Sequence, residues 1–148
     1  HGVLRKTELE SRYEIYKEQY EKTIHIEAEC ALDMAKTMII PVALEYQSDV
    51  ARTIEEVTNC GVKQKETVEL LKKISGLTEK ALSDIRKLEK AVEKGEAAGM
   101  ITAMTSLRAN VDALEGLVPD EIWPLPSYTE MMFRLSEWIL VNTPNRAA

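Results

Sequence analysis

The sequence predicts an all-α protein, a helical bundle, and three observations support that prediction. Apolar residues recur at steps of three and four along most of the chain, which is the period of one helical face. Two stretches in the middle of the chain carry heptads with apolar a and d positions. Charged residues make up 30% of the chain and aromatic residues only 5%, a balance that favours helix over sheet.

The first helical stretch covers about residues 6–58. Its apolar positions advance in steps of three and four and include Tyr13, Tyr16, Tyr20, Ile24, Ala28, Ala31, Ala35, Met38 and Ile39. Pro41 interrupts this pattern, because it lacks a backbone donor and its ring clashes with the carbonyl of Thr37. We therefore expect a kink or a break near Pro41, with the helix ending at residues 59–61 (NCG).

The second and third stretches predict an antiparallel helical hairpin over about residues 64–118. Residues 64–93 and 97–117 each carry a heptad, but the two heptads are out of register with one another. The register breaks at residues 95–99 (GEAAG), where two glycines supply a turn. The heptad positions are Leu71, Ile74, Thr78, Ala81, Ile85, Leu88 and Val92 in the second stretch, and Met100, Met104, Leu107, Val111, Leu114 and Val118 in the third.

A short C-terminal helix is predicted to start at Ser127. Ser127 and Glu130 match a capping box, in which each side chain bonds the backbone donor of the other residue. Before this helix, Pro124 and Pro126 hold the chain extended, and Trp123 is predicted to anchor the returning segment on the bundle. The four helices fit one domain, residues 1–148. The chain opens without an initiator methionine, so we expect a fragment of a larger protein.

The charge pattern argues against nucleic acid as a partner. The chain carries 19 basic and 25 acidic residues, a net charge of −6, whereas a phosphate binder needs a clustered basic face. Lysines crowd residues 63–94, but acidic residues alternate with them as on a solvated helix surface. These acidic residues are Glu66, Glu69, Glu79, Asp84, Glu89 and Glu93.

Neither a membrane segment nor a disulfide framework is predicted. The longest apolar run, residues 38–44, is too short to span a membrane and contains Pro41. The two cysteines, Cys30 and Cys60, lack CxxC spacing, which fits a reducing compartment. We therefore expect no membrane partner and a cytoplasmic location.

No catalytic, cofactor-binding or metal-ligating residue is assigned from the sequence. Glu21, His25 and Glu29 lie four residues apart on one helix face, but a metal site in a bundle needs a second such motif. Cys30 and Cys60 have no suitable histidine base and are expected to be buried, reduced thiols. Residues 95–99 lack the lysine of a phosphate-binding loop. The stripe of Tyr13, Tyr16 and Tyr20 suits a protein interface or an ordinary core equally well.

Two separated stretches resemble the end of type III glutamine synthetases. The first holds residues 8–16 (ELESRYEIY), 23–28 (TIHIEA), 32–35 (LDMA) and 40–41 (IP), and the second holds 111–115 (VDALE) and 123–133 (WPLPSYTEMMF). Residues 134–148 extend beyond the expected end of such a chain, as a lineage-specific tail or a sign that the match is to a relative.

The resemblance implies a bacterial-type, ATP-dependent ligase that makes glutamine from glutamate and ammonia with a divalent metal such as Mg or Mn. It also implies a homo-oligomer, with the catalytic residues in a preceding region. On this reading the chain is a C-terminal structural and assembly domain without an active site, whose partners are the catalytic region and neighbouring subunits. A regulatory cover over the active-site entrance is a weaker hypothesis. The alternative is a free-standing helical adaptor that binds a partner helix through the tyrosine stripe.

Overall fold

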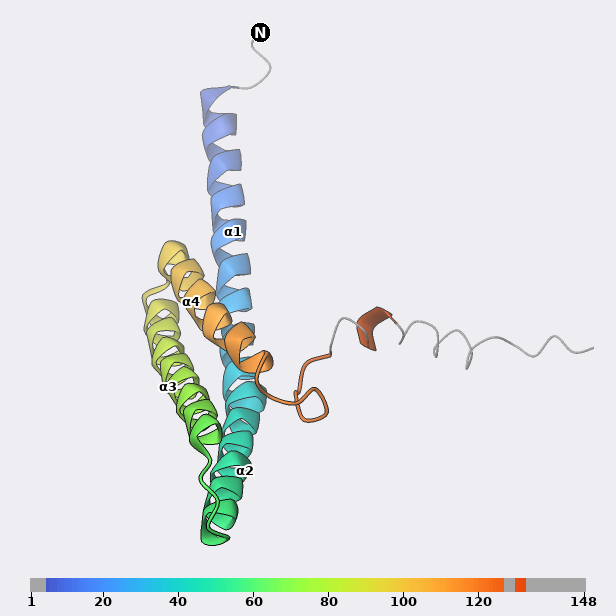
Figure 1. The fold of residues 1–148 in the computed structure, drawn as a ribbon. Coiled ribbons are helices and arrows are strands. Elements are labelled where there is room, and N and C mark those ends of the chain that lie inside the picture. The colour runs from blue at the N-terminus through green and yellow to red at the C-terminus, as the bar shows by residue number, and fades with distance from the viewer. Residues whose placement is uncertain (1–4, 127–129, 133–148) are drawn as a thin grey trace, which may run out of the picture.

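The computed structural model describes residues 5–126 and 130–132. Every regular element in these ranges is a helix, which confirms the all-α prediction. In chain order the elements are α1 (Lys6–Met34), the π-helical turn η1 (Ala35–Ile39), α2 (Ile40–Asn59), α3 (Lys65–Lys94) and α4 (Ala97–Glu115). Figure 1 shows α1 and α2 as one long rod, with α3 and α4 packed along part of its length.

The rod passes through Pro41 without a break. Helical residues follow one another from the start of α1 to the end of α2, and the irregularity predicted near Pro41 is the π-helical turn η1 just before it. In this turn the Ile40 N–H bonds the carbonyl of Ala35, five residues earlier. An α-helix would press the proline ring against the Thr37 carbonyl, and the wider turn relieves that contact. Pro41 then lies in the first turn of α2, where its missing donor costs least.

The turn after α2 ends the helix where the sequence predicted. Cys60 is the cap residue, and Gly61 follows at φ +83°, in the left-handed region that favours glycine. The Gly61 N–H donates to the Thr58 carbonyl at 2.9 Å, and the Val62 N–H donates to the Val57 carbonyl at 3.3 Å. This pair of bonds is a Schellman motif, which satisfies carbonyls that the helix end would otherwise leave unpaired.

Helices α3 and α4 form the predicted antiparallel hairpin (Figure 1). Gly95 ends α3 at φ +71°, and its N–H bonds the carbonyls of Ala91 and Val92. The two heptads meet in the core, where the buried members are Ile74, Thr78, Ala81, Ile85 and Leu88 from α3, and Met100, Leu107, Val111, Leu114 and Val118 after the turn. Leu71, Val92 and Met104 are partly buried at its edges.

The rod and the segment after α4 complete the core. From the rod, small or branched side chains pack against the hairpin, namely Ala28, Ala35, Ile39, Ile40, Ala43 and Val50. Trp123 is 8% exposed and lies in the same cluster, which confirms its predicted role as an anchor. Its backbone N–H bonds the carbonyl of Pro119 at 3.1 Å, so a tight turn returns the chain to the bundle.

The predicted C-terminal helix and its capping box fall largely outside the described residues. Residues 130–132 are helical, whereas Ser127 and residues 133–148 are not described. Among the helices that are described, none is long and apolar enough to cross a membrane.

Candidate functional site

The N-terminal half of α1 carries an exposed apolar face. Residues 5–23 are all exposed, and in Figure 1 this part of the rod projects beyond the α3–α4 hairpin. Leu9, Tyr13, Tyr16 and Tyr20, here called the Tyr face, are 58%, 67%, 69% and 54% exposed. Their steps of four, three and four place them on one side of the helix. In the part of the chain that the structure describes, the tyrosine stripe is therefore not part of the core.

Charged side chains flank the Tyr face and support the projecting helix. Ion pairs between residues four apart join Lys6 to Glu10 at 3.7 Å, Lys17 to Glu21 at 3.8 Å and Glu18 to Lys22 at 2.7 Å. The hydrogen bond from Lys22, together with its charge, holds the pKa of Glu18 below the ordinary value. Opposite charges at this spacing favour helix even where no tertiary contact exists.

A buried carboxylate joins α3 to α4. Asp84 is 3% exposed and accepts hydrogen bonds from Lys87 Nζ at 2.6 Å, Ser106 Oγ at 2.8 Å and Asn110 Nδ2 at 2.7 Å. Burial raises the pKa of Asp84, but the three hydrogen bonds and the Lys87 charge outweigh burial and hold the pKa below its ordinary value. The expectation that Asp84 belongs to a solvated surface is wrong, because two of its donors come from the facing helix.

The Asp84 cluster has the chemistry of a structural cross-link. All three neighbours donate to this one carboxylate, and Ser106 and Asn110 do so from the facing helix α4. Asn110 also donates to the backbone carbonyl of Ser106 at 3.2 Å, which holds its amide in place. A different register between α3 and α4 would cost Asp84 the hydrogen bonds from Ser106 and Asn110, so the cluster favours the observed packing of the two helices.

The polar residues weighed as a metal site do not come together. His25 Nε2 lies 3.5 Å from Glu29 Oε1, whereas Glu21 pairs with Lys17. Within residues 5–126 and 130–132, no group of three or more His, Cys, Asp or Glu side chains is arranged to hold a metal ion. A hollow of about 510 Å³ lies between α2 and α3, and its lining includes one charged side chain, Lys72.

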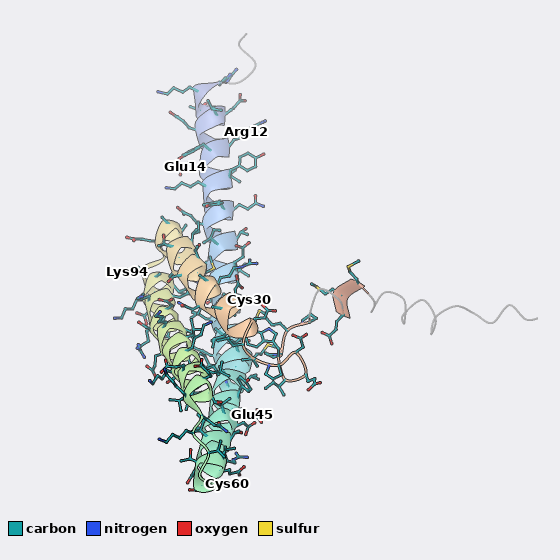
Figure 2. The ribbon with its side chains drawn as sticks, in the orientation of Figure 1. Arg12, Glu14, Cys30, Glu45, Cys60 and Lys94 are labelled. Atoms are coloured by element: carbon teal, nitrogen blue, oxygen red, sulfur yellow. The ribbon has the colours of Figure 1, made fainter. Side chains whose placement is uncertain are left out.

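Both cysteines are free and exposed, so the expectation of buried thiols is wrong. Cys30 lies on α1 near its entry into the bundle, and Cys60 lies at the far end of α2, as Figure 2 shows. The nearest sulfur contact is from Cys30 Sγ to Met34 Sδ at 3.9 Å, one turn along the same helix. Residue type alone favoured burial, but the position of each thiol relative to the hairpin decides its exposure.

Comparisons with known protein families and with individual proteins both find glutamine synthetases. Residues 1–58 match the family model described as the glutamine synthetase C-terminal domain. The chain is 30% identical to the type-3 glutamine synthetase of Dictyostelium discoideum over 150 residues, 89% of the chain and 20% of that relative. It is 32% identical to a glutamine synthetase of Butyrivibrio fibrisolvens over 149 residues, 91% of the chain and 21% of the relative.

A third relative extends this pattern. The chain is 28% identical to a glutamine synthetase of Bacteroides fragilis (strain YCH46) over 149 residues, 88% of the chain and 20% of that relative. The chain thus spans about a fifth of the length of the curated relatives that it matches. No solved structure matches it. The family model and the relatives confirm the resemblance found in the sequence: residues 1–58 match the glutamine synthetase C-terminal domain, and the similarity to glutamine synthetases continues over about nine-tenths of the chain.

Proposed function

We propose that this chain is a structural and assembly domain of a type-3 glutamine synthetase. The parent enzyme would be a cytoplasmic, bacterial-type ligase of nitrogen metabolism that forms glutamine from glutamate, ammonia and ATP. The family match supports the parent, and the relatives' roughly fivefold greater length supports a role as one domain among several. We further propose that residues 1–148 form a single domain.

The exposed Tyr face is the observation that carries the assembly role. Helix α1 buries its C-terminal part against the hairpin but extends an apolar side beyond it, where no described residue covers Leu9, Tyr13, Tyr16 or Tyr20. Tyrosines are enriched at protein interfaces because the ring buries apolar area while the hydroxyl bonds a partner or water. An apolar side of this kind, rimmed by charges, marks a surface that another protein covers.

The chemistry of the parent is assigned to the rest of the enzyme. The family implies ATP and a divalent metal, but the described residues hold no suitable group of metal ligands. The buried carboxylate of Asp84 already accepts three hydrogen bonds, from Lys87, Ser106 and Asn110. We therefore place the nucleotide, the metal and all catalytic residues outside this domain, which contacts the catalytic region and neighbouring subunits.

The assembly role can be tested in the enzyme that contains this chain. The full-length protein and a variant lacking the domain are compared by mass photometry and by glutamine formation. Loss of the assembled oligomer, with loss of activity following from it, is the expected result. An intact oligomer with altered activity would contradict the assembly role and favour the regulatory hypothesis instead.

A free-standing helical adaptor is the second candidate, and the same exposed Tyr face suits it. The two candidates differ in where the partner is found. An adaptor would bind a separate protein and would be produced on its own, whereas an assembly domain is translated in one frame with the catalytic region. Mass spectrometry of the native protein measures its length directly. A native mass near 16.7 kDa, the mass of this chain, would favour the adaptor.

A further inference from the structure

The Tyr face has the spacing of a short coiled-coil seam. The steps of four, three and four from Leu9 to Tyr20 are the steps between alternating d and a positions of a heptad. Leu9 and Tyr16 take d positions, and Tyr13 and Tyr20 take a positions. A seam of this kind is covered by a second helix that offers a matching seam.

We propose that the Tyr face pairs with the Tyr face of a second copy of this chain, with the two α1 helices antiparallel. The inference rests on the proposed assembly role and names its partner. Placing Tyr13 of one helix opposite Tyr16 of the other puts Leu9 opposite Tyr20 at both ends. The same four positions of each copy are then covered, which is the self-complementary pattern of a two-fold interface.

The residues beside the seam favour this partner and this orientation. In an antiparallel pair the e positions face each other, so Glu10 of each copy faces Lys17 of the other. The g positions, Arg12 and Gln19, also face each other and carry no like charges. In a parallel pair, Arg12 of one copy would face Lys17 of the other, and these like charges would repel. The same pair would bring Arg5 of one copy to Glu10 of the other, but this attraction would do no more than cancel the repulsion.

The charged groups that this pairing needs are available at the surface. The Lys17 and Glu10 side chains are 58% and 60% exposed. Their partners within the helix, Glu21 and Lys6, lie 3.8 and 3.7 Å away, at the long end for an ion pair. These weak contacts leave both groups free to meet a second helix.

The size of the interface sets the concentration at which pairing is seen. With exposed fractions of 54–69% and about 200 Å² for a tyrosine, covering the Tyr face buries roughly 500 Å² per copy. The total of about 1,000 Å² lies at the lower limit for a specific interface. The 148-residue chain should therefore dimerise weakly and reversibly, at concentrations on the order of 100 μM.

Charge reversal across the proposed interface tests both partner and orientation. Sedimentation velocity of the reduced 148-residue chain measures dimerisation for the wild type, Glu10→Lys, Lys17→Glu and the double variant. Each single change turns two attractive contacts into repulsive ones, so dimerisation should weaken about tenfold. The double variant restores opposite charges and should return to within about threefold of the wild type.

Two further variants separate the Tyr face from the other exposed apolar side chains. Tyr16→Glu places a charge in the middle of the seam and should abolish the dimer. Ile15→Glu is the matched control, because Ile15 is 60% exposed but lies about 130° around the helix from the middle of the Tyr face. Both residues are on the projecting helix, so circular dichroism should show equal helix content for the two variants.

Three results would overturn the inference. The first is a wild-type chain that stays monomeric at these concentrations, and the second is a double variant as weak as the single variants. The third is an Ile15→Glu variant as weak as Tyr16→Glu. Any of these would leave the Tyr face to another region of the enzyme or to another protein. The proposed assembly role would still stand or fall separately, on whether the enzyme lacking this domain assembles.

Discussion

Replacement of Asp84 by alanine tests whether the buried carboxylate cross-links the hairpin. The wild-type carboxylate accepts hydrogen bonds from Lys87, Ser106 and Asn110, so Asp84→Ala removes three contacts at once. The matched control is Asp112→Ala on α4, because Asp112 is exposed and its nearest cation, Arg108 Nε, is 3.7 Å away. Both variants remove a helical aspartate, and they differ in burial and in partners.

The expected cost follows from what the donors do once the carboxylate is gone. Hydrogen bonds to a charged acceptor contribute about 1.5–3 kcal/mol each, but exposed donors recover much of this from water. Lys87 and Ser106 are exposed, so most of the loss falls on the Asn110 contact and on helix packing. We expect Asp84→Ala to lower the free energy of unfolding by about 2 kcal/mol, or the melting temperature by roughly 6 °C. Asp112→Ala should cost less than about 0.5 kcal/mol.

Urea unfolding followed by circular dichroism measures both variants, and its pH dependence gives a second check. The folded pKa of Asp84 lies below its ordinary value of 3.8, so its contribution is fully present above about pH 4. That contribution is lost as the pH falls through the folded pKa. The stability gap between wild type and Asp84→Ala should therefore be constant from pH 7 to about pH 5 and shrink in stronger acid.

Two results would refute this reasoning. One is a cost for Asp84→Ala no larger than that for Asp112→Ala at pH 7. The other is a gap that does not shrink below about pH 4. A double-mutant cycle with Asn110→Ala checks the cross-link directly, because residues in one hydrogen-bond network should show a coupling energy of about 1 kcal/mol.

Four other predictions concern a turn, a glycine inside α3, an anchor and the projecting helix. Gly95→Ala should lower the free energy of unfolding by about 1 kcal/mol in thermal melts, because Gly95 has φ +71° and no atom within 4 Å that would add a clash. Gly76→Ala, inside α3 and equally uncrowded, should raise it by up to about 1 kcal/mol. Trp123→Ala should lower the free energy of unfolding, measured in urea, by about 3 kcal/mol. The whole loss should come from packing, because the Trp123 Nε1–H has no hydrogen-bond acceptor in the described chain. In hydrogen exchange, residues 6–22 should exchange much faster than α3 in dilute protein and slow down at concentrations where the dimer forms.

The hairpin was predictable because its information is local. In each helix a heptad of apolar residues indicates which side is buried. The heptad register breaks at the glycines of residues 95–99, which predicts a turn there. The structure confirms the buried sides and the turn, with Gly95 in the left-handed conformation. The burial of Trp123 was predictable for a similar reason. Two prolines hold the chain after it extended, so the large indole side chain must pack on another part of the molecule.

Two kinds of feature could not be predicted from the sequence. Some depend on contacts with residues far away in the chain, and others depend on which of several possible backbone conformations is adopted. Asp84 sits among alternating charges that suggest solvent, and its donors Ser106 and Asn110 lie 22 and 26 residues later on the facing helix. Pro41 indicates that one helical hydrogen bond is missing, but a kink, a break and a π-helical turn can each accommodate the proline. The sequence pattern of the tyrosine stripe is the same for a stripe in a core and for a stripe on an exposed surface. Only the length by which α1 extends beyond the hairpin distinguishes the two cases.

The projecting half of α1 depends on the rest of the rod for its stability. Isolated helices of its length are marginal in water, and residues 5–23 are exposed throughout, so its stability rests on local ion pairs and on continuity with the buried half. The unbroken passage through η1 matters for the same reason, because it couples the projecting half to a rod anchored by the hairpin core. The family model matches residues 1–58, the part of the chain that holds the Tyr face, η1 and nearly all of α2. A rod that is anchored at one end and carries the exposed Tyr face on one side of the other end has the shape that the proposed assembly role needs.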